Sequence, residues 1–417
     1  MSWKKVKLGD IADFSNGINF GKDAYGKGIK IIGVSNFGDR FFPEYESLEE
    51  VKEEVVRKND YLISGDMVFV RSNGNKELVG RCMLVDCPLN PVTYSGFCIR
   101  ARLKDITKHY PPFWTYHFKN VSFRRAMSGA AVGANIQNLS QGRLSTYEAV
   151  VPDFHSQVRI ANILSPYDHL IENNKKQIKL LEEAVHRLYK EWFIDLHFPG
   201  YEEMKIVNGV PEKWNKKTVL ECLESYIGGG WGKDSIVGKN TISGKVIRGT
   251  DINNIKSGVF NGVPLRYHTE NDKNKRALRE NDIVFELSNG NIDNIGRSLL
   301  IDDYILKNCG DNTICASFCK LLRPLDRIHA LLLYLEIQDM QSSGRMMQYK
   351  KQGSNGINNF AFDDFLSHEL LVTNDYSMLL PIENIISQIS IKQNQLTLLT
   401  LSSLTEPKPE CASENMV

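Results

Sequence analysis

The sequence predicts a mixed α/β protein: two similar globular domains separated by two long helices that form an antiparallel, pseudo-twofold coiled coil. Three observations predict it: a heptad pattern in the middle of the chain, a duplication on either side of it, and a second apolar helical stripe near the end. The expected parts are a first domain at 1–153, a central spacer helix at 154–200, a second domain at 201–375, a second spacer helix at 376–404 and a flexible tail at 405–417.

The central helix is predicted from two apolar lines that alternate at spacings of three and four, which is typical of a coiled coil. One line is Leu164, Ile171, Ile178, Val185 and Trp192, and the other is Ile160, Tyr167, Asn174, Leu181 and Leu188. Asn174 is a polar interruption of the kind that sets helix register. The alternative is an amphipathic helix lying on a globular core. A helix from Gln157 to Phe193 would be about 55 Å long.

The chain repeats itself on the two sides of this helix. The clearest match aligns 66–86 with 282–302, where eleven of twenty-one positions are identical, including Asp66 with Asp282. A later segment, Val132–Leu139, corresponds to Gly353–Phe360. Two copies separated by one helix indicate a duplication, not a solenoid.

Each copy mixes short alternating strands with helices, so we interpret each as a mixed α/β domain with a curved sheet. The predicted strands are Met67–Val70, Ile283–Phe285 and Thr313–Leu321. The predicted helices are Pro111–Ser128 and Ala330–Met340.

A second helix follows the second copy and carries its own apolar stripe. The stripe consists of Ile382, Ile385, Ile389, Leu396 and Leu399. This helix is shorter than the first and ends before Pro407, and the tail beyond it is polar.

Composition gives loose bounds on the class of protein. The chain has 417 residues, with 51 Lys and Arg against 50 Asp and Glu, so net charge alone neither suggests nor excludes a nucleic-acid partner. No apolar run approaches the length of a membrane span, so we expect a cytoplasmic protein with no membrane partner. The eight cysteines lack paired metal-binding spacing, and we expect reduced thiols.

The sequence argues against catalysis and against a bound metal or cofactor. The Gly21–Lys27 segment resembles the start of a phosphate loop, but Gly28 stands where Ser or Thr is needed. Pro111-Pro112-Phe113 resembles the end of an amino-methyltransferase motif, but Tyr110 replaces the Asn or Asp that accepts a proton. Metalloprotease and nucleophile-elbow motifs are absent.

The shared motifs favour recognition of DNA. A Ser-Asn-Gly-Asn segment follows a predicted strand in each copy, with an arginine shortly after, and amides and guanidinium groups pair with base edges. Neighbouring positions differ between the copies. Two domains that recognise different base sequences would need such differences. The alternatives are that Asn-Gly only forms a tight turn and that the arginines brace the fold. The candidate DNA-contacting residues are Lys22, Asn36, Arg71, Ser72, Asn73, Asn75, Arg81, Asn135, Asn138, Lys233, Arg248, Ser288, Asn289, Asn291, Arg297, Asn355 and Asn358.

The whole arrangement resembles a specificity subunit of a type I restriction–modification system. The resemblance rests on the module–helix–module–helix order, the repeated Asp66–Asn75 motif, and a helix that passes through Leu188–Phe193 and closes at Phe198–Gly200. It implies two target recognition domains, each reading half of a split site in double-stranded DNA. The second helix lacks a match for Ala184–Phe193, so docking at that end could be shortened.

The same resemblance implies partners. The helices would set the spacing of the half-sites and dock two modification subunits, which carry S-adenosylmethionine, while ATP-dependent restriction subunits complete the complex. The chain itself would hold no cofactor. Two other interpretations stay open: a coiled-coil adaptor that binds no DNA, and the DNA-recognition part of a self-contained restriction–methylation enzyme.

Overall fold

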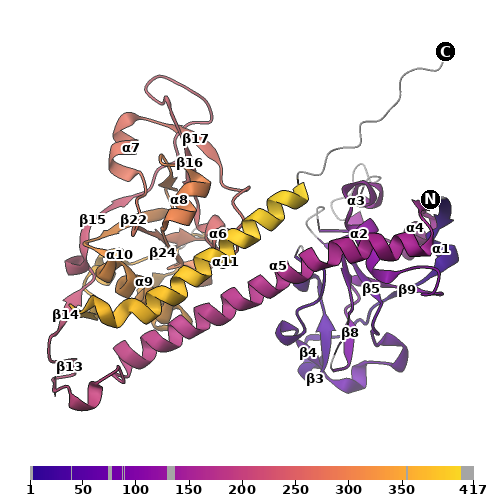
Figure 1. Cartoon of the computed structure of the whole chain (residues 1–417), viewed down its shortest axis with the longest axis horizontal. Helices are drawn as coiled ribbons and strands as arrows, with labels where there is room; N and C mark the ends of the chain where they lie inside the picture. Colours follow the sequence, from indigo (N-terminus) through magenta and orange to yellow (C-terminus); the bar gives the residue numbers. More distant parts are fainter. Residues whose placement is uncertain are drawn as a thin grey trace. The chain divides into compact units, whose positions relative to one another are not determined.

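The computed structural model describes residues 3–38, 40–73, 78–86, 88, 90–128, 137–353 and 356–404 (Figure 1). The chain divides into two compact units, Met1–Glu172 and Asn173–Val417, and each is described separately below. We call residues 1–153 module 1 and residues 201–375 module 2. The predicted fold class is confirmed, because both modules mix helices with strands and two long helices accompany them.

Module 1 is built on an antiparallel four-stranded sheet with the strand order β2-β9-β5-β7. A three-stranded sheet, β4-β3-β8, pairs β3 with β8 in parallel. The strands are β1 Lys4–Lys7, β2 Ala12–Asn16, β3 Tyr25–Ile32, β4 Glu50–Val51, β5 Met67–Val70, β6 Ser72–Asn73, β7 Cys82–Leu84, β8 Val92–Tyr94, β9 Cys98–Leu103, β10 Gln137–Asn138 and β11 Glu148–Val151. Strand β1 pairs with β11, and β6 pairs with β10.

Module 2 repeats the topology of these sheets, and it has three additional short strands, β12, β13 and β23. Its four-stranded sheet has the order β15-β22-β18-β20, and its three-stranded sheet, β17-β16-β21, again contains one parallel pair. The strands are β12 Ile206–Val207, β13 Val210–Pro211, β14 Trp214–Thr218, β15 Leu223–Gly228, β16 Ile242–Ile247, β17 Leu265–His268, β18 Ile283–Glu286, β19 Ser288–Asn289, β20 Ser298–Leu300, β21 Ile314–Cys315, β22 Cys319–Pro324, β23 Lys350–Lys351, β24 Asn358–Phe360 and β25 Glu369–Thr373. The predicted duplication is therefore also present in the strand pairing.

Helices complete the core of each module. They are α1 Leu8–Ile11, α2 Pro111–Lys119, α3 Val121–Ser128 and α4 Gln141–Thr146 in module 1, and α6 Ile252–Lys256, α7 Glu270–Arg276, α8 Asp303–Cys309, α9 Arg327–Ser342 and α10 Phe362–Leu366 in module 2. The prediction of one helix at Pro111–Ser128 was wrong, because Asn120 has an extended backbone that separates α2 from α3. Trp114 and Phe118 of α2 are buried in the module 1 core.

The aspartate that opens the shared motif has a structural role in both modules. Asp66 is buried and accepts two hydrogen bonds from Arg102, at 2.7 and 2.6 Å. Asp282 accepts two from Arg323, at 2.9 and 2.8 Å. A bidentate pair of this kind offsets the cost of burying its charges, and it ties the start of one central strand to the next.

The central helix, α5, runs from Phe154 to Tyr189 and continues as a π-helical turn at Lys190–Ile194. In the first unit its Asp168 accepts a 2.5 Å hydrogen bond from Tyr116 of α2. In the second unit Tyr189 donates a 2.6 Å hydrogen bond to Glu336 of α9. Of the heptad residues, Asn174, Ile178, Val185 and Trp192 are buried, Ile160, Leu164, Ile171, Leu181 and Leu188 are half-buried, and Tyr167 is exposed.

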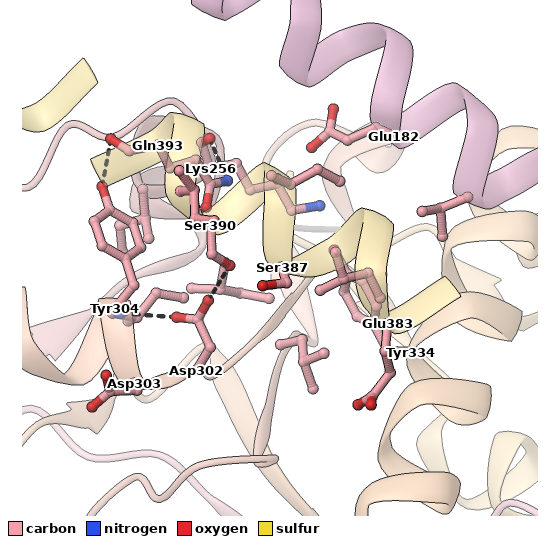
Figure 2. A pocket seen from close by; sticks show the side chains of 18 of the residues that line it. Glu182, Lys256, Asp302, Asp303, Tyr304, Tyr334, Glu383, Ser387, Ser390 and Gln393 are labelled. Carbon is pink, nitrogen blue, oxygen red and sulfur yellow. Dashed lines mark hydrogen bonds between the residues drawn. The ribbon is translucent and has the colours of Figure 1, made fainter. Parts of the chain in front are cut away.

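The second long helix, α11, spans Leu380–Leu404. Ile382, Ile389 and Leu396 are buried, while Ile385 and Leu399 are half-buried. Two polar residues on the same face fasten it to module 2 through hydrogen bonds that the apolar pattern did not predict. Gln393 donates to the Lys256 carbonyl at 2.7 Å (Figure 2). Thr397 donates to the Gly258 carbonyl at 2.7 Å.

Within the second unit, α11 and the end of α5 run in opposite directions (Figure 1). Both helices line a groove of about 1020 Å³ whose floor comes from α6, α8 and α9 (Figure 2). Glu182 and Val185 line it from α5, and Ser387 and Ser390 line it from α11. Ser390 is fixed there by a 2.6 Å hydrogen bond to Asp302.

Two glycines are required where a strand end passes close to the neighbouring hairpin. A Cβ atom on Gly17 would lie 2.2 Å from the Tyr94 carbonyl oxygen, and one on Gly229 would lie 2.1 Å from that of Ala316. We expect Gly17→Ala and Gly229→Ala each to lower the free energy of unfolding by about 2 kcal/mol or more, because backbone must move. Urea denaturation measures this. Gly228→Ala is the control, since a Cβ there meets nothing within 4 Å, and an equal loss in that variant would contradict the explanation.

Candidate nucleic-acid interface

Strand pairing brings together the two sequence segments from which most candidate contacts were drawn. In module 1, Ser72 lies opposite Asn138 in the β6–β10 pair. In module 2, Ser288 lies opposite Asn359, and Asn289 lies opposite Asn358, in the β19–β24 pair. The Ser-Asn motif and the later Asn-containing segment therefore form one structure in both copies, although more than sixty residues separate them in the chain.

A turn beside each Ser-Asn motif extends this structure. In module 1 the Phe97 carbonyl accepts hydrogen bonds from the backbone N–H groups of Arg71 and Ser72, at 2.8 and 3.4 Å. In module 2 the Phe318 carbonyl accepts from Leu287 and Ser288, at 2.9 and 3.3 Å. The same contact thus holds the β8–β9 turn and the β21–β22 turn against the motif.

A glycine-containing loop lies on the other side of the turn. In module 1 Gly96 donates its N–H to the Ile18 carbonyl at 2.7 Å, which places the loop leading to Lys22 beside the turn. In module 2 Gly230 donates to the Cys315 carbonyl at 2.9 Å. Lys22 and Lys233 are exposed, and Lys233 is held through two backbone hydrogen bonds to Tyr267.

These loop, turn and motif segments make up what we call the motif edge of each module. It comprises 17–22, 71–72, 95–97 and 138 in module 1, and 229–233, 287–289, 316–318 and 358 in module 2. The equivalent edge is thus assembled twice from equivalent strands.

Several candidate side chains of module 2 are engaged within the protein. Asn289 donates from Nδ2 to Glu286 at 2.7 Å and accepts at Oδ1 from the N–H of Asn291 at 2.8 Å. Asn358 donates to the Gly290 carbonyl at 3.0 Å, and Ser288 donates to Asn359 at 2.7 Å. The turn-forming role that the sequence left open is therefore present here, and contact with DNA stays a prediction.

Arg297 and Arg81 follow the motif and also make internal contacts. Arg297 donates from Nε to Glu286 at 2.8 Å, and their side chains are only 16% and 3% exposed. A Cβ on Gly249 would lie 1.9 Å from the same carboxylate, so glycine is needed there. In module 1, where Val70 replaces Glu286, Arg81 donates instead to the Gly38 carbonyl. Both arginines thus brace loops.

Three other candidates have local roles. Arg248 forms a bidentate pair with Asp251, at 2.8 and 2.7 Å, and these hydrogen bonds raise the pKa of Arg248. Asn36 accepts the N–H of Gly33 at 2.7 Å and so closes a short helical turn. Arg71 donates from Nη1 to the Gly96 carbonyl at 3.1 Å, which anchors it at the motif edge.

Four candidates lie wholly or partly outside the described residues. Asn75, Asn135 and Asn355 belong to segments that the structure does not describe. Asn73 is described only through its backbone pairing with Gln137.

In the part of the chain that the structure describes, no group of three or more His, Cys, Asp or Glu side chains that could hold a metal ion is found. Burial raises the pKa of the Cys98 thiol, next to the module 1 turn, to about 12, and it raises the pKa of its counterpart Cys319 well above its ordinary value. Both thiols therefore stay protonated near neutral pH and are poor nucleophiles. No described helix is long and apolar enough to cross a membrane.

Sequence reasoning did not single out Phe97 and Phe318, whose turns form part of the motif edges. The prediction of one strand at Thr313–Leu321 was wrong, because Cys319 donates its N–H to the Ala316 carbonyl at 2.8 Å and closes a turn within that stretch. A signal was available, since a shared spacing of Phe, Cys, Arg and Asp links 97–105 with 318–326.

The fold thus consists of two matching modules with long helices, and a polar edge recurs in each module. Residues 1–183 match the family model described as "Type I restriction modification DNA specificity domain". Over this part, the chain is similar to the specificity subunits of type I restriction–modification systems.

Individual relatives show similarity to the same family. The MjaIX specificity subunit of Methanocaldococcus jannaschii is 32% identical over 114 residues, which are 26% of each chain. The StySPI specificity subunit of Salmonella potsdam is 23% identical over 318 residues, covering 76% of this chain and 65% of that one. The chain thus spans less than two thirds of the length of these curated relatives.

A solved structure supports the fold over almost the whole chain. The type I restriction–modification S subunit from M. genitalium superposes with a TM-score of 0.56 at 15% identity, covering 97% of this chain and 94% of that one. The family model ends at residue 183, so its match does not extend to module 2. Module 2 is related to module 1 by the repeated topology of its sheets.

Proposed function

We propose that this protein is the DNA-reading specificity subunit of a type I restriction–modification complex, with each module reading one half of a bipartite target in double-stranded DNA. The observation that carries the proposal is the motif edge, which has the same backbone plan in both modules but different side chains. Arg71 corresponds to Leu287, and Val70 corresponds to Glu286. One scaffold with two sets of side chains suits recognition of two different base sequences.

The long helices support a role in spacing. Helix α5 is continuous for 36 residues, which corresponds to about 54 Å at a rise of ~1.5 Å per residue. One turn of B-DNA is ~34–36 Å long, so a helix of this length is on the scale that separates two half-sites. Tethering also raises the effective concentration of the second module once the first is bound.

The partners follow from the same proposal. Two modification subunits dock on the helices and supply S-adenosylmethionine, and restriction subunits supply ATP-driven translocation and cleavage. This chain contributes sequence choice in the cytoplasm and performs no catalytic step itself.

Exchange of one module tests the proposal. We expect that replacing residues 1–151 with the matching domain of a relative changes one half-site of the methylated target and leaves the other half intact. The readout is sequencing of methylated positions in DNA from cells that contain the modification subunits.

The reciprocal exchange, of residues 201–375, is the matched control and should change only the opposite half-site. A change in both half-sites after either exchange contradicts independent reading. An unchanged target after both exchanges contradicts reading by these modules.

A further inference from the structure

Two aromatic side chains project from equivalent turns of the motif edges. Phe97 is 63% exposed and Phe318 is 60% exposed, whereas the residues that follow them, Cys98 and Cys319, are fully buried. Exposing a large aromatic side chain forgoes the free energy that its burial would provide. The two copies have diverged elsewhere at this edge, yet both retain this exposed ring.

The backbone beneath each ring is held firmly. Each Phe carbonyl accepts two N–H groups from the adjacent motif, and the N–H of the following cysteine closes the turn at 2.8 Å in both modules. In module 1 a Cβ on Gly96 would lie 1.9 Å from the Asn19 side-chain oxygen, so the turn is packed on that side as well. A ring with only two side-chain torsions on a rigid turn loses little entropy on contact with a ligand.

The surroundings of the rings include polar groups on the motif side. Arg71 and Ser72 lie next to Phe97, and Leu287 and Ser288 lie next to Phe318. An exposed ring beside hydrogen-bonding groups is suited to bases, which offer π faces and thymine methyl groups next to phosphates. It is less suited to a protein partner, whose contact surfaces have an extended apolar centre.

We propose that Phe97 and Phe318 contact bases directly, one in each half-site, through stacking or apolar contact. This inference rests on the proposed DNA-reading function and assigns the contact to two particular side chains. Phosphate contacts would then fix the position of each module on the duplex, while the rings help to discriminate sequence.

The test uses the full-length chain and a pool of random duplexes, from which bound DNA is recovered and sequenced. We expect Phe97→Ala to weaken binding to the enriched duplex by about 10-fold or more and to relax one half of the enriched motif. Phe318→Ala should relax the other half. The slope of affinity against salt concentration should stay unchanged, because no phosphate contact is lost.

Matched controls lie at the opposite ends of the same strands. Ile106→Ala follows β9, and Leu325→Ala follows β22; both residues are exposed. They should retain the affinity and the motif of the unaltered chain. Phe97→Leu separates the two kinds of contact: retained affinity indicates apolar contact, and lost affinity indicates stacking.

Two results overturn the inference: the phenylalanine variants behave like the Ile106 and Leu325 controls, or they weaken binding to enriched and random duplexes equally. If the unaltered chain enriches no motif, the proposed function fails, and this inference fails with it. If both Phe→Ala variants still enrich the same motif as the unaltered chain, this inference is wrong but the proposed function stands.

Discussion

Raising the salt concentration from about 50 mM to about 200 mM is expected to weaken binding of this protein to duplex DNA by about 10³-fold or more. The loss follows from counterion release, because each phosphate neutralised by Lys or Arg frees a condensed cation, and we expect the two modules together to make about six or more such contacts. A salt series with a fluorescent duplex, fitted as log affinity against log salt concentration, measures the slope.

Each lysine that contacts a phosphate should contribute a similar amount to the slope of log affinity against log salt concentration. Lys22 and Lys233 are exposed beside the motif edges, and Lys22→Ala or Lys233→Ala should each lower the slope by about one. Lys307→Ala is the control, because this exposed lysine pairs with Asp303 on α8, away from the motif edge. A flat salt response contradicts DNA binding and favours the coiled-coil adaptor.

The second large effect is expected from the buried ion pair of module 2. Asp282→Ala should lower the free energy of unfolding by about 3–5 kcal/mol, because it leaves Arg323 as a buried charge without its partner. The two side chains are only 2% and 12% exposed. Urea denaturation followed by tryptophan fluorescence measures the change.

The corresponding pair of module 1 provides an internal comparison. Asp66→Ala should cost less, because the Arg102 side chain is 34% exposed and can be hydrated after the change. Asp303→Ala, which removes an exposed helix pair on α8, should leave the unfolding midpoint nearly unchanged. A midpoint for Asp282→Ala equal to that of Asp303→Ala would show that the buried pair does not stabilise the module.

Features with a strong periodic or repeated signal could be predicted from the sequence. The heptad lines of α5 predicted a long helix, and the structure contains one from Phe154 to Tyr189. The strand at Met67–Val70 and the helix around Ala330–Met340 are confirmed as β5 and α9. Such patterns predict secondary structure well because the periodically spaced apolar residues are also the residues that the fold buries.

The parts that could not be predicted depend on contacts between distant residues. Arg297 looked like a candidate contact from its position after the motif, but Glu286, eleven residues earlier, holds it inside the module. Gln393 and Thr397 looked like interruptions of an apolar stripe, whereas their hydrogen bonds fasten α11 to module 2. The helical pattern does not indicate which carbonyl group a polar side chain will bind, because that group belongs to a distant part of the chain.

The sequence by itself determined that the chain is duplicated, that long helices accompany two mixed modules, and that a Ser-Asn motif recurs at the end of a strand, since repetition and periodicity are properties of order along the chain. Only the tertiary structure decided that this motif pairs with a segment more than sixty residues away and shares an edge with Phe97 or Phe318. The reason is physical: strand pairing and turn closure satisfy backbone hydrogen bonds between residues remote in sequence, and only folding chooses those partners.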